Sequence, residues 1–131
     1  MKNKKVLIVS ARYYEDLSKS LELAASSFLR DKKIIFKIIN VPGVFEIPVV
    51  ISKNIKKYDG FIALGCVIKG ETPHFDFISQ ATTNAIMQLS IDHKKPIGNG
   101  IITSLNTEQA SIRSKKKGGE AARAVISVLS Q

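Results

Sequence analysis

The sequence predicts an α/β fold, because strand patterns and helix patterns alternate along its 131 residues. The strand patterns are short unbroken apolar runs, which are typical of strands buried on both faces of a parallel sheet. Between them, apolar residues recur at helical spacing. Apolar residues make up 44% of the chain, enough for a hydrophobic core, and the length suits a single domain over residues 1–131.

The strand patterns occur at four places, residues 6–9, 34–39, 59–68 and 96–103. The second is rich in β-branched residues, which favour strands, and the fourth contains two glycines. Helix patterns fill the intervals and the C-terminal part, at residues 17–30, 47–55, 78–93, 107–113 and 119–129. Pro48 must lie in the first turn of the second helix, because a proline further in would break it.

Parallel strands joined by helices predict a three-layer α/β/α sandwich of the flavodoxin-like kind, with a four-stranded parallel sheet flanked by helices. In such sheets, ligands bind beyond the carboxyl ends of the strands. Four segments meet at that edge, namely residues 10–14, 40–46, 67–74 and the chain from 104 onward. A functional site is therefore expected among these segments.

The chain carries a net charge of +9, with 20 basic and 11 acidic residues. That surplus suits an anionic partner, but 16 of the 20 cations are Lys, and most aromatic residues lie in apolar runs. Nucleic-acid readers usually interleave cations with exposed aromatic rings or use Arg, so we expect no nucleic-acid role. The single cysteine excludes an intramolecular disulfide, and no apolar stretch is long enough for a signal peptide or a membrane span. We expect a cytoplasmic protein with no membrane partner.

Three protein classes that commonly have this fold need residues that this sequence does not have. A dinucleotide site needs glycines in the first strand-to-helix turn, which reads SARYY at residues 10–14. A phospho-receiver domain needs an acidic acceptor after the third strand, which ends GCVI at 65–68. A low-molecular-weight phosphatase needs Arg six residues after its Cys, where Thr72 stands.

Two aromatic residues at the predicted site edge suggest binding of a flat heterocycle. Tyr13 follows the first strand and Phe45 the second, so their rings could sandwich such a ligand. Glu46 could accept hydrogen bonds from sugar hydroxyls or ring nitrogens. Alternatively, Phe45 is a core residue and Glu46 an acid favoured at a helix N-terminus, and the pattern leaves both interpretations open.

A second group of residues predicts an anion site with acid–base chemistry. Thr72 is a good N-cap and Pro73 suits the first helical position, so the following helix would present its N–H groups to an anion. Arg113 could add a bidentate phosphate contact. His74 could exchange protons near neutral pH, although an isolated His in a first turn is more often a surface residue. Cys66, in an apolar strand, is interpreted as a small core residue.

Two strings make the sequence recognisable: VPGVFEIP at residues 41–48 and GCVIKGETPHFD at 65–76. Further matches are Thr103, EQA at 108–110 followed by Arg113, and KG at 117–118 followed by EAA at 120–122. Over essentially its whole length, the chain resembles the lumazine synthase family of riboflavin biosynthesis.

The resemblance implies condensation of 5-amino-6-(D-ribitylamino)uracil with 3,4-dihydroxy-2-butanone 4-phosphate to 6,7-dimethyl-8-ribityllumazine, phosphate and water, without metal or organic cofactor. By the same resemblance, the Tyr13 ring would stack on the pyrimidine of the uracil substrate. The other residues expected to bind this substrate are Val44, Phe45, Glu46, Cys66, Val67 and Ile68. The resemblance assigns the butanone phosphate to Glu71, Thr72 and Arg113, and proton transfer to His74. The competing hypothesis is a relative that binds lumazine or flavin without turnover.

The resemblance also implies a homopentamer with active sites between subunits, and it leaves open a shell of twelve pentamers and association with riboflavin synthase. Two departures concern the site. Asn99 stands where many members have a Phe that a neighbouring subunit contributes to cover the bound ring, and at this position Asn99 is expected to bind the uracil substrate by a hydrogen bond from its amide. The stretch after Arg113 is shorter than in several relatives, which implies a tighter loop near the phosphate.

Overall fold

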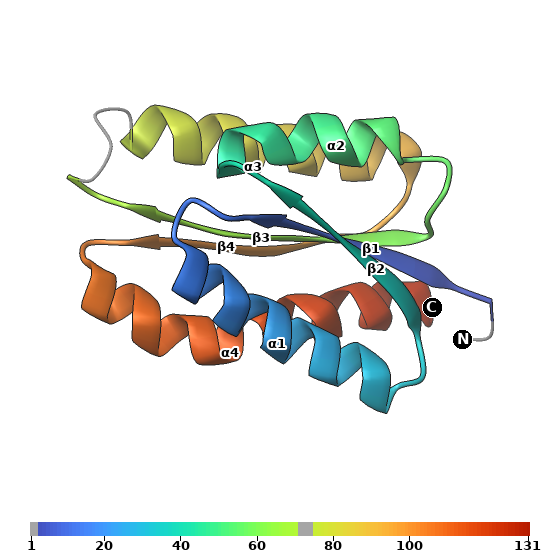
Figure 1. Cartoon of the computed structure of the whole chain (residues 1–131). Helices are drawn as coiled ribbons and strands as arrows, with labels where there is room; N and C mark the ends of the chain where they lie inside the picture. Colours follow the sequence, from blue (N-terminus) through green and yellow to red (C-terminus); the bar gives the residue numbers. More distant parts are fainter. Residues whose placement is uncertain (1–2, 71–74) are drawn as a thin grey trace.

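The computed structural model describes residues 3–70 and 75–131 and shows a parallel sheet between two layers of helices (Figure 1). The strand order is β2-β1-β3-β4, and all three pairings are parallel. The strands are β1 (Lys5–Ala11), β2 (Ile35–Val41), β3 (Gly60–Ile68) and β4 (Ile97–Ser104). The predicted α/β/α sandwich of flavodoxin-like type is confirmed.

The helices cover both faces of the sheet. In Figure 1, α1 (Glu15–Asp31) and α4 (Thr107–Leu129) lie on one face, and α2 (Ile47–Lys53) and α3 (Phe75–His93) on the other. A short 3₁₀ turn, η1 (Val44–Glu46), leads into α2, and Pro48 stands in the first turn of that helix as expected. In the part of the chain that the structure describes, no helix is both long and apolar enough to cross a membrane.

The core consists of two clusters, one on each face of the sheet. Side chains of a strand alternate between faces, so Ile62 and Leu64 pack beneath α1 and α4, whereas Phe61 and Ala63 pack toward α2 and α3. All nine residues of β3 are buried, because this strand lies inside the sheet and both its faces are covered. The unbroken apolar run in the sequence has this cause.

The C-terminal part corrects two predictions. Separate helices were expected at 107–113 and 119–129, with a tight loop after Arg113, but residues 107–129 form one helix without a loop. Lys115–117 and two glycines interrupt the apolar pattern there, yet Gly118 lies where α4 crosses α1. A Cβ atom at Gly118 would come 2.1 Å from the carbonyl oxygen of Leu21. Glycine therefore allows the two helices to pack closely. That packing offsets the cost of glycine in a helix, which is about 1 kcal/mol relative to alanine.

Candidate active site

A cavity of about 200 Å³ opens at the carboxyl edge of the sheet, where β1 and β3 end. Six of the residues expected to bind the uracil substrate line it: Tyr13, Val44, Phe45, Glu46, Cys66 and Val67. They come from the β1–α1 turn, from η1 and from β3, which are far apart in the sequence. The topology thus gathers most of the predicted binding residues into one cavity.

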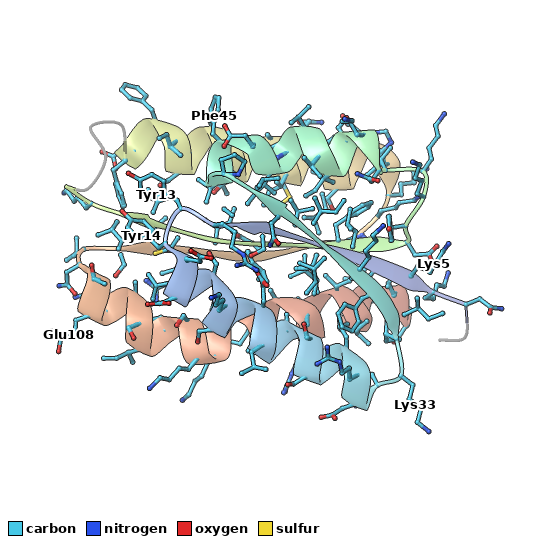
Figure 2. The ribbon with its side chains drawn as sticks, viewed as in Figure 1. Lys5, Tyr13, Tyr14, Lys33, Phe45 and Glu108 are labelled. Atoms are coloured by element: carbon cyan, nitrogen blue, oxygen red, sulfur yellow. The ribbon has the colours of Figure 1, made fainter. Side chains whose placement is uncertain are left out.

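The aromatic residues form exposed walls of this cavity. Tyr13 and Phe45 are each 64% exposed, and Figure 2 shows them at the same end of the molecule, opposite Lys5 and Lys33. Tyr13 packs edge-on against Tyr14, with ring centroids 4.9 Å apart. Phe45 is therefore not a core residue, which removes that alternative. Two large exposed rings beside one cavity are suited to holding a flat ligand.

The floor of the cavity is apolar and chemically inert. Val44, Cys66 and Val67 are buried. Burial raises the pKa of the Cys66 thiol from 9.0 to about 11, while the positive charge of Arg113 opposes the shift. The thiol therefore stays protonated near neutral pH, and a protonated thiol is a poor nucleophile. Cys66 shapes the cavity as a small core residue, as predicted.

Glu46 closes the loop that carries Phe45. The backbone N–H of Gly43 donates a 2.9 Å hydrogen bond to Glu46 Oε1. This contact spans the 3₁₀ turn and holds Phe45 between the two bonded residues. Glu46 also directly precedes α2, so the helix N-terminus favours its negative charge. The side chain therefore has a structural role and also lines the cavity.

Three other predicted residues do not line this cavity. Ile68 is 1% exposed and packs in the core under α1 and α4. Arg113 Nη1 on α4 donates a 2.7 Å hydrogen bond to the carbonyl oxygen of Thr103, at the end of β4. Asn99, in the middle of β4, borders a separate hollow of about 80 Å³ that residues of α3 also line. Its Oδ1 accepts a 3.0 Å bond from Ile101 N–H, so its amide nitrogen remains as a donor.

Comparison with known proteins matches the chain to a family. The family model described as 6,7-dimethyl-8-ribityllumazine synthase matches residues 3–131. A protein of that name from Agrobacterium fabrum is 42% identical over 95% of this chain and 91% of its own length. Similar proteins from Bartonella tribocorum and Rhodopseudomonas palustris are 44% and 43% identical over 95% of this chain, and over 87% and 83% of their own lengths. The chain belongs to this family.

In this member of the lumazine synthase family, three residues that line the cavity were not predicted from the sequence. Tyr14, Gly43 and Ile78 also line it. Gly43 belongs to the string that carried the resemblance, and Tyr14 follows Tyr13, so both had a usable signal. Ile78 was interpreted only as part of the apolar face of its helix, because spacing alone does not distinguish a residue facing a core from one facing a cavity.

Three predicted residues, Glu71, Thr72 and His74, lie outside the described residues. In the chain they fall between Val67 and Ile78, both of which line the cavity. Within residues 3–70 and 75–131, no group of three or more His, Cys, Asp or Glu side chains is placed to hold a metal ion.

Proposed function

We propose that the cavity between Tyr13 and Phe45 is the substrate site for the lumazine synthase reaction that family membership assigns to the chain. In that reaction, 5-amino-6-(D-ribitylamino)uracil and 3,4-dihydroxy-2-butanone 4-phosphate condense to 6,7-dimethyl-8-ribityllumazine, phosphate and water. The observation that carries the proposal is an open apolar cavity with two exposed aromatic walls at the carboxyl edge of a parallel sheet. Such a cavity suits a planar pyrimidine.

The uracil substrate would stack on Tyr13 and Phe45, above the floor formed by Val44 and Val67. Its polar edge would meet backbone groups at the end of β3. There β3 is paired with β4 as far as Ile68 but with β1 only as far as Leu64, so in the described sheet the N–H and C=O groups on the β1 side have no strand partner. Glu46 Oε1 is engaged by Gly43 N–H, and its second carboxylate oxygen would accept hydrogen bonds from hydroxyls of the ribityl chain.

The butanone phosphate would bind through Arg113, Glu71 and Thr72. The guanidinium of Arg113 has further N–H donors beyond the one bonded to Thr103, and these suit a phosphate group. The amino group of the uracil attacks the ketone carbonyl, and loss of water forms an imine. Phosphate then leaves, and ring closure releases a second water. His74 would donate and accept the protons of these steps, a contribution of about a hundredfold or more in rate.

The catalytic unit would be a homopentamer, with sites between subunits. Asn99 borders a separate hollow and not the cavity of its own chain, and we assign it to the cavity of a neighbouring subunit. Arg113 is close enough to Cys66 for its charge to act on that thiol in the floor of the cavity of the same chain. The segment 77–91 of α3 contains no charged residue, and Phe77, Met87 and Ile91 of that helix are each at least 59% exposed. An uncharged, partly apolar helix face is suited to packing against other subunits.

Sedimentation of the purified protein tests the assembly. A pentamer supports the proposal, whereas a monomer that turns over substrate would refute shared sites. The same measurement, with and without riboflavin synthase, would reveal a shell of twelve pentamers or an association of the two enzymes. The proposed compartment is the cytoplasm.

The first experiment on function mixes the protein with both substrates and follows lumazine formation by absorbance and fluorescence, against the uncatalysed background. Accelerated formation is expected, and His74→Ala should reduce kcat by roughly a hundredfold. A folded pentamer that binds the lumazine without accelerating its formation would refute the proposed catalysis and indicate a binding protein. Equal turnover by His74→Ala would refute the role of His74 alone.

A further inference from the structure

A bidentate ion pair is formed by Arg12, the residue before Tyr13, and Glu22. Arg12 Nε and Nη2 each lie 3.0 Å from a different carboxylate oxygen of Glu22. The Glu22 side chain is 12% exposed and that of Arg12 is 30% exposed. A partly buried pair is favourable only when its geometry is good and further hydrogen bonds support it. Here the contact is bidentate, and Glu22 Oε2 accepts one more hydrogen bond, from Asn40.

The pair connects three elements. Arg12 follows β1, Glu22 lies on α1, and Asn40 near the end of β2 donates from Nδ2 to Glu22 Oε2 at 3.2 Å. The backbone N–H of Arg12 also donates to the carbonyl oxygen of Val41 at 2.8 Å. The carboxylate of Glu22 is therefore the common partner of the segments leaving β1 and β2, which are neighbours in the sheet (Figure 1).

Those two segments carry the walls of the cavity. Tyr13 is the residue after Arg12, and Phe45 stands five residues after Asn40 in the turn that Glu46 closes. A shift of either segment would change the separation or tilt of the two rings. Stacking requires parallel planes in close contact, so it depends strongly on that geometry.

We propose that Arg12, Glu22 and Asn40 form a positioning clamp that sets the spacing of the Tyr13 and Phe45 walls and thereby the affinity for the flat heterocycle. The clamp rests on the proposed function, because it acts on the site assigned there. Its members need not touch the substrate. They act on the binding of the pyrimidine, and the chemical step at saturation is left nearly unchanged.

The test is Glu22→Gln, with Glu15→Gln as the matched control. The introduced amide replaces one of the two acceptor oxygens by an NH₂ group and removes the negative charge, so the two-pronged contact to Arg12 is lost without a change in side-chain size. Glu15 also faces Arg12, with its Oε1 3.6 Å from Arg12 Nη1, but its side chain is 66% exposed, and such surface pairs contribute little. The two variants therefore make the same charge change next to the same arginine.

We expect Glu22→Gln to raise KM for the uracil substrate and Kd for the lumazine product roughly tenfold, because small misplacements of binding groups have large effects. The kcat at saturation and KM for butanone phosphate should stay within about twofold, and Glu15→Gln should match the wild type. A purely structural role would lower stability and the active fraction, which reduces kcat and leaves KM and Kd unchanged. That result would overturn the clamp.

Asn40→Ala and Arg12→Lys keep the proposal testable if Glu22→Gln fails to fold. Asn40→Ala removes one hydrogen bond, and Arg12→Lys keeps the charge but loses the two-pronged contact. Both should raise KM for the uracil substrate in the same direction, by a smaller factor. Unchanged KM and Kd in these variants would refute the clamp. Failure of the wild type itself to bind the lumazine would instead refute the proposed function.

Discussion

Two adjacent glycines on α4 allow the packing of α1 on α4 to be tested. Gly118→Ala would place a methyl group 2.1 Å from the carbonyl oxygen of Leu21 and 3.2 Å from its Cα. Ordinary van der Waals contact begins at 3.4 Å, so the helices must separate by more than about 1 Å to admit the methyl group. Overpacking of this kind costs about 1–3 kcal/mol. The gain of about 1 kcal/mol from replacing Gly in a helix only partly offsets it.

Gly119→Ala is the control, because its methyl group would lie 3.7 Å from the nearest atom, the carbonyl oxygen of Ala24. That distance is ordinary contact, so the better helix propensity of Ala should raise the free energy of unfolding by about 0.5–1 kcal/mol.

The assay is urea unfolding followed by circular dichroism, at one protein concentration for all variants, because assembly couples stability to concentration. We expect Gly118→Ala to unfold at lower urea than the wild type and Gly119→Ala at higher urea. A Gly118→Ala protein as stable as Gly119→Ala would show that α1 and α4 do not approach so closely, and the reasoning would be refuted.

Three further predictions concern the site. Phe45→Ala should raise KM for the uracil substrate about tenfold, because it removes one aromatic wall. Val49→Ala, which truncates another exposed apolar side chain, on α2, should leave this KM unchanged. Equal effects of the two substitutions in steady-state kinetics would contradict the stacking role. Cys66→Ala should keep turnover, and because the folded pKa of the thiol is raised from 9.0 to about 11, the wild type binds that proton more tightly when folded. Its stability should therefore fall between about pH 9 and 11 relative to Cys66→Ala, and parallel stability curves from urea titrations over that range would contradict the shift. Arg113→Gln should raise KM for butanone phosphate about tenfold or more through loss of a charged phosphate contact, while Arg123→Gln, the same charge change further along α4, should leave it near the wild-type value.

Much of the fold was determined by patterns that are local in the sequence. Strand β3 could be recognised because a central parallel strand is buried on both faces and so reads as an unbroken apolar run. The edge on which a site should form followed from the order of elements alone. Tyr13 and Phe45, which line the cavity, could be predicted for the same reason, since each lies in the segment that follows a strand of that sheet.

Only the tertiary structure decided features that depend on residues far apart in the chain. The continuity of α4 across Gly118 depends on the carbonyl of Leu21, which no pattern within α4 reveals. Ile78 faces a cavity through the packing of α3 beside β3 and η1. The pairing of Glu22 with Arg12 and Asn40 depends on how α1 crosses the ends of two strands. Apolar periodicity shows that a side chain is covered. What covers it is set by contacts that form only when the layers come together.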